Sequence, residues 1–205
     1  MSNSLVKIAV LVSGGGTNLQ ALIDAQSSGI LNSGKIDLVI SNNPNAYAIE
    51  RAVKAGIDYA VVCKKDCASQ QEFEDKIIEL IEDRGIDLIV LAGFMSILGE
   101  NFTKQYDKRI INVHPSLIPS FCGKGFYGLK VHEEALKYGV KVTGATVHFV
   151  NEIPDGGKII MQKAVKIRKG DTPEVLQKRV MVQAEWKILP ASCEMVCKQI
   201  LKNKK

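Results

Sequence analysis

The first half of this chain alternates short apolar runs with longer segments whose apolar residues recur every three or four positions. Such alternation is typical of parallel strands joined by crossover helices. It predicts five strands, at 7–12, 36–41, 58–62, 87–92 and 109–113. It also predicts helices at 17–28, 45–55 and 69–84, each followed by a glycine that can end a helix, namely Gly29, Gly56 and Gly85.

The pattern changes after Pro115, where a stretch rich in proline and glycine reaches Gly128 and a short helix is predicted at 131–138. Two further runs, 141–151 and 158–168, alternate with a period of two. A turn between them contains Pro154, Gly156 and Gly157. The two runs therefore predict an antiparallel hairpin added to the sheet.

A long final helix is predicted at 172–202. Because Pro190 disturbs a helix interior, we expect a kink or break near Ile188 or Leu189. The sequence shows no internal repeat and no flexible linker. The expected fold class is α/β, as a single domain over residues 1–205 with a Rossmann-like, mixed but mainly parallel sheet, helices on both faces, and a C-terminal antiparallel hairpin and long helix.

Composition and charge restrict the function classes. The 205 residues are 46% hydrophobic and carry a net charge of +5, and four of the last eight residues are lysines. Basic side chains do not form a stripe with interleaved aromatics, so we expect a solvated tail and no nucleic-acid partner. No apolar run approaches a membrane span, and no signal segment precedes the first strand, so we expect no membrane partner and a cytoplasmic protein.

Five cysteines without regular framework spacing predict reduced thiols, as buried small hydrophobes. The pairs Cys63 with Cys67 and Cys193 with Cys197 have a spacing of four. Since no histidine or second cysteine pair lies near the latter pair in sequence, we expect no metal site.

The clearest candidate for binding is the segment SGGGTN, residues 13–18, which follows an apolar strand and opens a helix. Glycines let backbone N–H groups approach a phosphate, and the helix N-terminus adds partial positive charge. The segment lacks the lysine of a Walker A loop and the spacing of a dinucleotide fingerprint. It predicts a monophosphate site, with a tight turn without a ligand as the alternative.

A second candidate is the segment INVHPS, residues 111–116, at the end of a predicted strand. Period two places Asn112 and His114 on one face, at the carboxyl edge where open α/β sheets bind ligands. The amide can stabilise an oxyanion and the imidazole can act as acid and base. The alternative for His114 is a structural hydrogen bond at the strand end.

Asp155 lies at the tip of the predicted hairpin, where Asp-Gly is also a common turn. The other two histidines are weaker candidates. His148 is predicted to be a sheet residue. His132 opens a helix, as a cap or as a contact behind the site.

These segments, together with LAGFMSIL (91–98), INVHPSLIP (111–119), the TVHFV strand and the DGG turn, resemble in that order the glycinamide ribonucleotide formyltransferases of purine biosynthesis, in the formyltransferase family. The resemblance runs from about Lys7 to Pro190. It implies the formyltransferase fold, with residues 1–105 as a phosphate-binding half and 106–205 as a catalytic and folate-binding half.

The resemblance also implies an activity: transfer of a formyl group from 10-formyltetrahydrofolate to the amino group of glycinamide ribonucleotide. The products would be formylglycinamide ribonucleotide and tetrahydrofolate, in de novo synthesis of IMP. It implies 10-formyltetrahydrofolate as co-substrate, no metal and no nicotinamide. We expect a monomer or a weak homodimer whose partners are these two small molecules.

Residue roles follow from the same resemblance. The implied catalytic residues are Asn112, His114 and Asp155, with Asp155 raising the pKa of His114. The implied phosphate and ribose contacts are Gly16, Thr17, Asn18 and Glu185. The implied folate contacts are Gln70, Met95, Ser96, Ile97, Leu98 and Asn112, although Gln70 and Ser96 stand where many members have arginine.

Four other functions remain as alternatives. 10-Formyltetrahydrofolate hydrolase and methionyl-tRNA formyltransferase share the catalytic trio, but the first carries an extra N-terminal region and the second an extra C-terminal barrel. We expect this chain to have room for neither. A phosphometabolite sensor or a weak RNA-binding module would instead show no turnover, and RNA binding would depend steeply on salt.

Overall fold

The computed structural model describes residues 5–204 and shows a seven-stranded sheet in the order β3-β2-β1-β4-β5-β6-β7. Neighbours from β3 to β5 are parallel, and β6 and β7 are antiparallel to the strands beside them. The predicted mixed, mainly parallel sheet with a terminal hairpin is therefore confirmed. The strands are β1 (Val6–Val12), β2 (Gly34–Ser41), β3 (Asp58–Val61), β4 (Leu88–Leu91), β5 (Ile110–His114), β6 (Val142–Phe149) and β7 (Ile159–Lys166).

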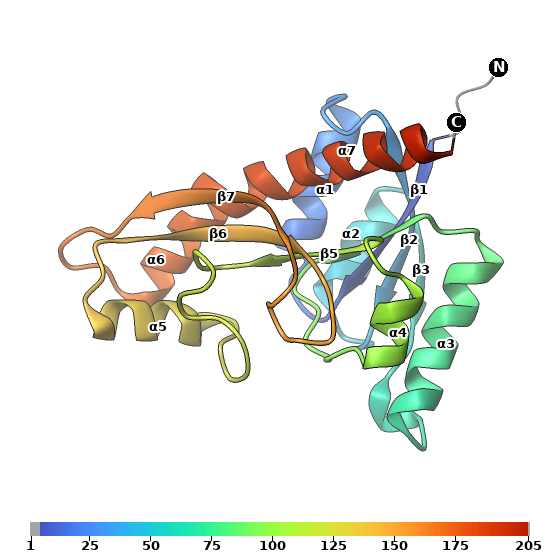
Figure 1. The fold of residues 1–205 in the computed structure, drawn as a ribbon, viewed down its shortest axis with the longest axis horizontal. Helices are drawn as coiled ribbons and strands as arrows, with labels where there is room; N and C mark the ends of the chain where they lie inside the picture. The colour runs from blue at the N-terminus through green and yellow to red at the C-terminus, as the bar shows by residue number, and fades with distance from the viewer. Residues whose placement is uncertain (1–4, 205) are drawn as a thin grey trace.

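Helices cover both faces of the sheet (Figure 1). The helices are α1 (Thr17–Ser27), α2 (Tyr47–Lys54), α3 (Gln70–Asp83), α4 (Glu100–Gln105), α5 (Leu129–Tyr138), α6 (Pro173–Val180) and α7 (Trp186–Asn203), with a 3-10 turn at Lys64–Asp66. Six of the seven lie where the sequence predicts helix, although α6 and α7, predicted as one helix, are separate elements. The sequence pattern missed α4, because six residues are too few to show a helical period.

Strand β1 shows how the two faces are divided. Its residues Ile8 and Val10 pack in the same core as α1 and α7, whereas Ala9 and Leu11 pack in the core that contains α3 and α4. Every one of these side chains is buried. A strand buried on both faces has no polar alternation, which is why β1 reads as a continuous apolar run.

The final helical segment differs from the prediction. Instead of one helix kinked near Ile188, α6 and α7 are separated by a π-helical turn at Met181–Glu185, and Pro190 lies inside α7. Proline cannot donate to the carbonyl of Trp186 and crowds it. The helix adjusts on the N-terminal side of that carbonyl, where Trp186 N–H bonds to the Met181 carbonyl in a widened turn.

The lysine-rich tail is helical as predicted up to residue 202, and two of its lysines also form ion pairs. Residues up to Asn203 continue α7, Lys198 forms an ion pair with Glu194 at 3.1 Å, and Lys204 forms one with Asp87. Lys205 lies outside the described residues. The five cysteines are free thiols, as predicted; Cys63, Cys193 and Cys197 are also buried as predicted, whereas Cys67 and Cys122 are only half-buried.

Candidate active site

The glycine loop joins β1 to α1 and lines a cavity of about 250 Å³. Gly16 is the N-cap of α1 and has a φ of 68°. A Cβ at Gly16 would lie 2.6 Å from the Ala48 Cβ of α2. The sequence explained this glycine by the close approach of a phosphate; the structure adds that its left-handed backbone and its contact with α2 both require glycine.

The N-terminus of α1 opens into the same cavity, which Thr17 and Asn18 also line. The first N–H groups of a helix have no partner inside the helix, and here no side chain caps them. Asn18 Nδ2 donates to Glu185 Oε2 at 2.7 Å, across 167 positions of sequence. The structure thus brings together Gly16, Thr17, Asn18 and Glu185, the residues for which the sequence predicts phosphate and ribose contacts.

Glu185 belongs to the π-helical turn, and only 5% of its surface is exposed. Burial raises its pKa to about 7, and the hydrogen bond from Asn18 opposes that rise. A π-turn inside a helical segment often marks a functional position. Here it carries Glu185, a carboxyl group poised between its neutral and charged forms.

We expect Glu185→Gln to become more stabilising, relative to wild type, as the pH rises from about 5 to about 8. Folded Glu185 keeps its proton up to about pH 7, whereas the unfolded chain releases it near 4.5, so wild-type stability is lost between these values. Glutamine stays neutral and still accepts from Asn18. The difference in unfolding free energy should grow by on the order of 2 kcal/mol.

Urea unfolding at both pH values measures this difference. The matched control is Glu79→Gln on the exposed face of α3, which should show no such pH dependence. A constant difference for Glu185→Gln would contradict the raised pKa.

The carboxyl end of β5 carries the second group of polar side chains. Asn112 and His114 lie on one face of the strand, as predicted, and pair in register with His148 and Thr146 of β6. Asn112 Nδ2 lies 3.2 Å from His148 Nε2, and His148 Nδ1 lies 2.8 Å from the Phe149 carbonyl. Because a carbonyl only accepts, neutral His148 carries its proton on Nδ1 and accepts from Asn112.

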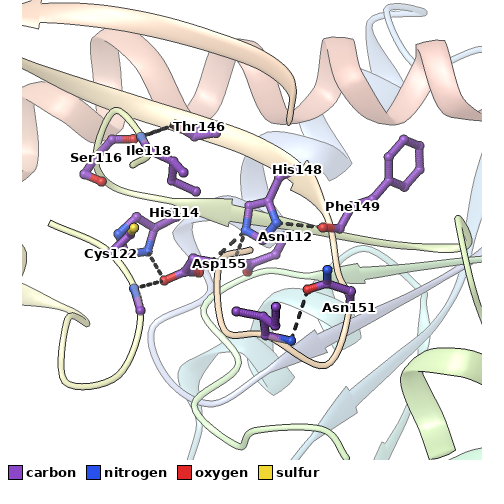
Figure 2. A network of polar contacts seen from close by, with 12 residues as sticks. Asn112, His114, Ser116, Ile118, Cys122, Thr146, His148, Phe149, Asn151 and Asp155 are labelled. Carbon is purple, nitrogen blue, oxygen red and sulfur yellow. Dashed lines mark hydrogen bonds and ion pairs between the residues drawn. The ribbon is translucent and has the colours of Figure 1, made fainter. Parts of the chain in front are cut away.

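Asp155 reaches this group from the loop between β6 and β7 (Figure 2). Its carboxylate lies between two imidazoles, with Oδ2 at 3.4 Å from His114 Nδ1 and Oδ1 at 3.6 Å from His148 Nε2. Gly123 N–H also donates to Oδ2, at 2.8 Å. The sequence offered two alternatives for Asp155, a turn residue or a partner of His114. In the structure Asp155 is both.

The same turn depends on Gly157, where a Cβ would lie 1.8 Å from the Phe149 carbonyl oxygen. The backbone can pass this close to the end of β6 only without a side chain. The DGG segment thus folds the loop tightly enough to carry Asp155 back over the end of β5.

The pKa of His114 corrects one prediction. The sequence predicts that Asp155 raises it, but the pKa lies below its ordinary value because burial disfavours the imidazolium more than Asp155 and the Phe121 carbonyl favour it. Only 4% of the His114 surface is exposed. The contribution of Asp155 has the predicted direction, and burial outweighs it.

The pKa of Asp155 lies below its ordinary value, which keeps the carboxyl group charged. Burial alone would raise the pKa of Asp155, but its contact with His148, the charge of His114 and the N–H of Gly123 together lower it. A charged carboxylate beside His114 stabilises the imidazolium whenever the ring takes up a proton.

The other nitrogen of His114 also has a partner. Nε2 lies 2.8 Å from the Phe121 carbonyl oxygen, so in the neutral ring Nε2 carries the proton and Nδ1 presents its lone pair toward Asp155. When the ring is protonated, Nδ1 donates to Asp155. The backbone of residues 121–123 thus contacts both members of the pair, a placement that the sequence pattern does not predict.

A second cavity of about 100 Å³ lies on the opposite side of the β5 end. Asn112 lines this cavity, whereas the adjacent Val113 lines the cavity of the glycine loop. Adjacent residues of a strand point to opposite faces. The polar end of β5 therefore stands between two separate cavities, an arrangement suited to two substrates.

The predicted folate residues lie in the loop after β4 and at the start of α3. Ser96, Ile97 and Leu98 line the second cavity, and Met95 lines the first. Gln70 Nε2 donates to the Ile97 carbonyl at 3.1 Å and to the Glu74 carboxylate. Gln70 therefore contacts the backbone of this loop.

Sequence analysis gave no role in the site to two residues that the structure places there. His148 contacts both Asn112 and Asp155, and its register opposite Asn112 was the only signal. Ser13 Oγ accepts the N–H of Met95 at 2.8 Å, which joins the glycine loop to the loop after β4. The serine begins the SGGGTN motif, but only the packed sheet brings Met95 to it.

His132 lies in the first turn of α5 and lines the cavity of the glycine loop. It is fully buried, and neither ring nitrogen has a hydrogen-bond partner among the described residues. Burial and the charge of His114 lower its pKa to about 4. His132 is therefore neutral and is not the helix cap that the sequence offered as one alternative.

Within residues 5–204, no three His, Cys, Asp or Glu side chains are grouped so that they could hold a metal ion. In the same part of the chain, no helix combines the length and apolar character needed to cross a membrane.

Comparison with known proteins identifies relatives of this chain. A 184-residue match to the phosphoribosylglycinamide formyltransferase of Haemophilus influenzae is 44% identical and covers 90% of this chain and 84% of that protein. The human trifunctional purine biosynthetic protein adenosine-3 is also 44% identical over 190 residues. That match covers 93% of this chain but 18% of the human protein, so the chain spans about a fifth of that relative.

Solved structures of similar fold bear names of the same kind as these sequence relatives. Glycinamide ribonucleotide transformylase 1 from Symbiobacterium toebii superposes with a TM-score of 0.89 at 37% identity, covering 97% of this chain and 90% of that one. The phosphoribosylglycinamide formyltransferase of Brucella melitensis gives a TM-score of 0.86 at 37% identity, covering 95% and 96%. The profile of the family described as formyl transferase matches residues 6–192. This chain therefore belongs to the formyl transferase family.

Proposed function

We propose that this protein transfers the formyl group of 10-formyltetrahydrofolate to the amino group of glycinamide ribonucleotide, in de novo purine biosynthesis. The observation that carries the proposal is the group of Asn112, His114 and Asp155 between two cavities at the end of β5. The names of the bacterial relatives support the ribonucleotide as acceptor. A folate as donor follows from the family resemblance.

The ribonucleotide is assigned to the cavity of the glycine loop. Its phosphate would accept from the N–H groups at Gly16, Thr17 and Asn18, where the helix dipole also favours negative charge. Its ribose hydroxyls would face Glu185, which can accept from them as a carboxylate. This orientation directs the amino group toward the end of β5.

The folate is assigned to the cavity beside Asn112. Ile97, which lines this cavity, exposes 65% of its surface, which leaves an apolar side chain available to cover a flat ring. Met95, 53% exposed, lies in the same loop but lines the cavity of the glycine loop. Ser96 and Leu98 line the same cavity as Ile97. Gln70, at the start of α3, donates to the Ile97 carbonyl. In this assignment Gln70 shapes the folate site through the backbone of the loop.

In the reaction, the amine nitrogen attacks the formyl carbon, and the carbonyl oxygen takes up the electron pair. One N–H of Asn112 contacts His148, which leaves the second N–H for this oxyanion. The attacking nitrogen then loses a proton, the oxygen returns its electron pair, and the bond from carbon to the folate nitrogen breaks as that nitrogen receives a proton. His114, as an imidazolium whose Nδ1–H faces Asp155, gives its Nε2 proton to the leaving nitrogen in place of the Phe121 carbonyl and takes one back from the amine.

One assay tests this function. The protein is mixed with 10-formyltetrahydrofolate, with and without glycinamide ribonucleotide, and deformylation is followed by absorbance. We expect release of the formyl group only when the ribonucleotide is present. Release without it would instead indicate a hydrolase, and no release in either mixture would overturn the proposal.

The free cysteines suit the reducing cytoplasm, where we place the reaction.

A further inference from the structure

Helix α2 and the loop before it contact the glycine loop on the side that faces away from the cavity. The carbonyl groups of residues 13, 14 and 15 each accept one hydrogen bond from this side: from Asn43 Nδ2 at 3.3 Å, from Ala48 N–H at 3.0 Å and from Arg51 Nε at 2.8 Å. Three successive carbonyl groups are thus held toward α2. This contact involves backbone atoms of the glycine loop, so its sequence determinants lie on α2 and in the loop before it, and not in the motif.

Holding the carbonyl groups also orients the N–H groups. In a trans peptide the C=O and N–H of one unit point in opposite directions. The N–H groups of residues 14, 15 and 16 therefore point away from α2, and none has a hydrogen-bond partner among residues 5–204. The same three glycines line the cavity assigned to the ribonucleotide. The contacts from α2 thus prepare a set of free donors for an anion.

Arg51 is the one charged side chain in this contact. Its Nη1 donates to Gln20 Oε1 of α1 at 2.9 Å, and its guanidinium lies over the Tyr47 ring, 5.0 Å from the centroid. The planar guanidinium can hold two acceptors at fixed angles, which an ammonium cannot. Arg51 thereby ties the loop, α1 and α2 together. It lines a separate depression with Gln20 and Trp186, behind the loop.

We propose that Arg51 is a positioning residue for phosphate binding: its hydrogen bond to the Gly15 carbonyl holds the peptide whose N–H, at Gly16, is presented to the phosphate of the ribonucleotide. This proposal rests on the proposed function. Arg51 acts through the backbone of the glycine loop and through Gln20. Replacing Arg51 should therefore leave folate binding, in the cavity on the other side of β5, unchanged.

The test is Arg51→Met, which keeps much of the apolar stem and removes both hydrogen bonds. We expect the Kd and KM for glycinamide ribonucleotide to rise about tenfold, since hydrogen bonds from a charged donor are lost. The KM for 10-formyltetrahydrofolate and kcat should stay within about twofold. Calorimetry gives the Kd without depending on turnover, and the effect should persist in about 0.5 M KCl, where remote charge is screened.

Two further variants separate this role from a general one. Lys54→Met is the matched control, because Lys54 also lies over the Tyr47 ring, at 5.6 Å, but is exposed on α2, where it pairs with Glu50 of the same helix; this variant should bind the ribonucleotide normally. Arg51→Lys should restore part of the affinity, since an ammonium keeps the charge but loses the planar fork. If Arg51→Met does not fold, Gln20→Ala, which removes one acceptor, should show a smaller loss in the same direction.

Several results would overturn the inference. They are an unchanged ribonucleotide Kd in Arg51→Met, an equal loss for both substrates, a loss that disappears in high salt, or full recovery in Arg51→Lys. A wild-type protein that does not bind the ribonucleotide would overturn the proposed function and the inference together. If the wild-type protein binds the ribonucleotide and Arg51→Met binds it equally well, the inference alone is overturned.

Discussion

Replacing His114 by alanine is expected to lower kcat by a factor of about 10²–10⁴, the usual contribution of a positioned acid–base group. His114 lies at the end of β5 with Asp155 at one ring nitrogen and the Phe121 carbonyl at the other. No described neighbour of the site can replace it, because His132 is held neutral by a pKa of about 4 and His148 Nε2, the nitrogen that faces the site, accepts the N–H of Asn112.

Steady-state kinetics with both substrates measures the loss, and calorimetry should show that ribonucleotide affinity changes little. His114 contacts neither the glycine loop nor Glu185 through a hydrogen bond. Turnover close to that of the wild type would refute the assignment of His114 as the acid and base. A large loss of ribonucleotide affinity would instead indicate that alanine releases residues 121–123 and disturbs the cavity.

Asp155→Asn is expected to move the titration of His114 to still lower pH and to reduce turnover by about tenfold or more. The carboxylate favours the imidazolium against the effect of burial, so its removal leaves only the Phe121 carbonyl to oppose burial. Asparagine suits this position for two reasons. It tolerates the φ of 58° that Asp155 adopts, and its side-chain oxygen can still accept the N–H of Gly123.

An NMR titration of the His114 ring, with a parallel pH–rate profile, measures both effects. The control is Asp107→Asn, the same change at an exposed residue that pairs with the adjacent Lys108; it should leave both the titration and the rate unchanged. An unchanged pKa and rate in Asp155→Asn would reduce Asp155 to a turn residue. Because His148 also contacts Asp155, its own titration should be followed in the same spectra.

Many features of the fold could be predicted because they depend on neighbours in sequence. The apolar runs of β1 and β4 are buried on both faces, and α3 shows a clear helical period, so local pattern and tertiary environment agree. The break in the last helix was predicted at the wrong place. Proline predicts a disturbance, but whether the turn before it widens depends on the packing of both helices.

Within the site, the sequence by itself determined which side chains share the end of β5, since a period of two puts Asn112 and His114 on one face. It also determined the glycine loop, because three glycines before a helix restrict the backbone to few conformations. Only the tertiary structure decided the rest. The pairing of Asn18 with Glu185 joins residues 167 positions apart, and the direction of the His114 pKa depends on burial, which arises only when distant segments pack around the ring.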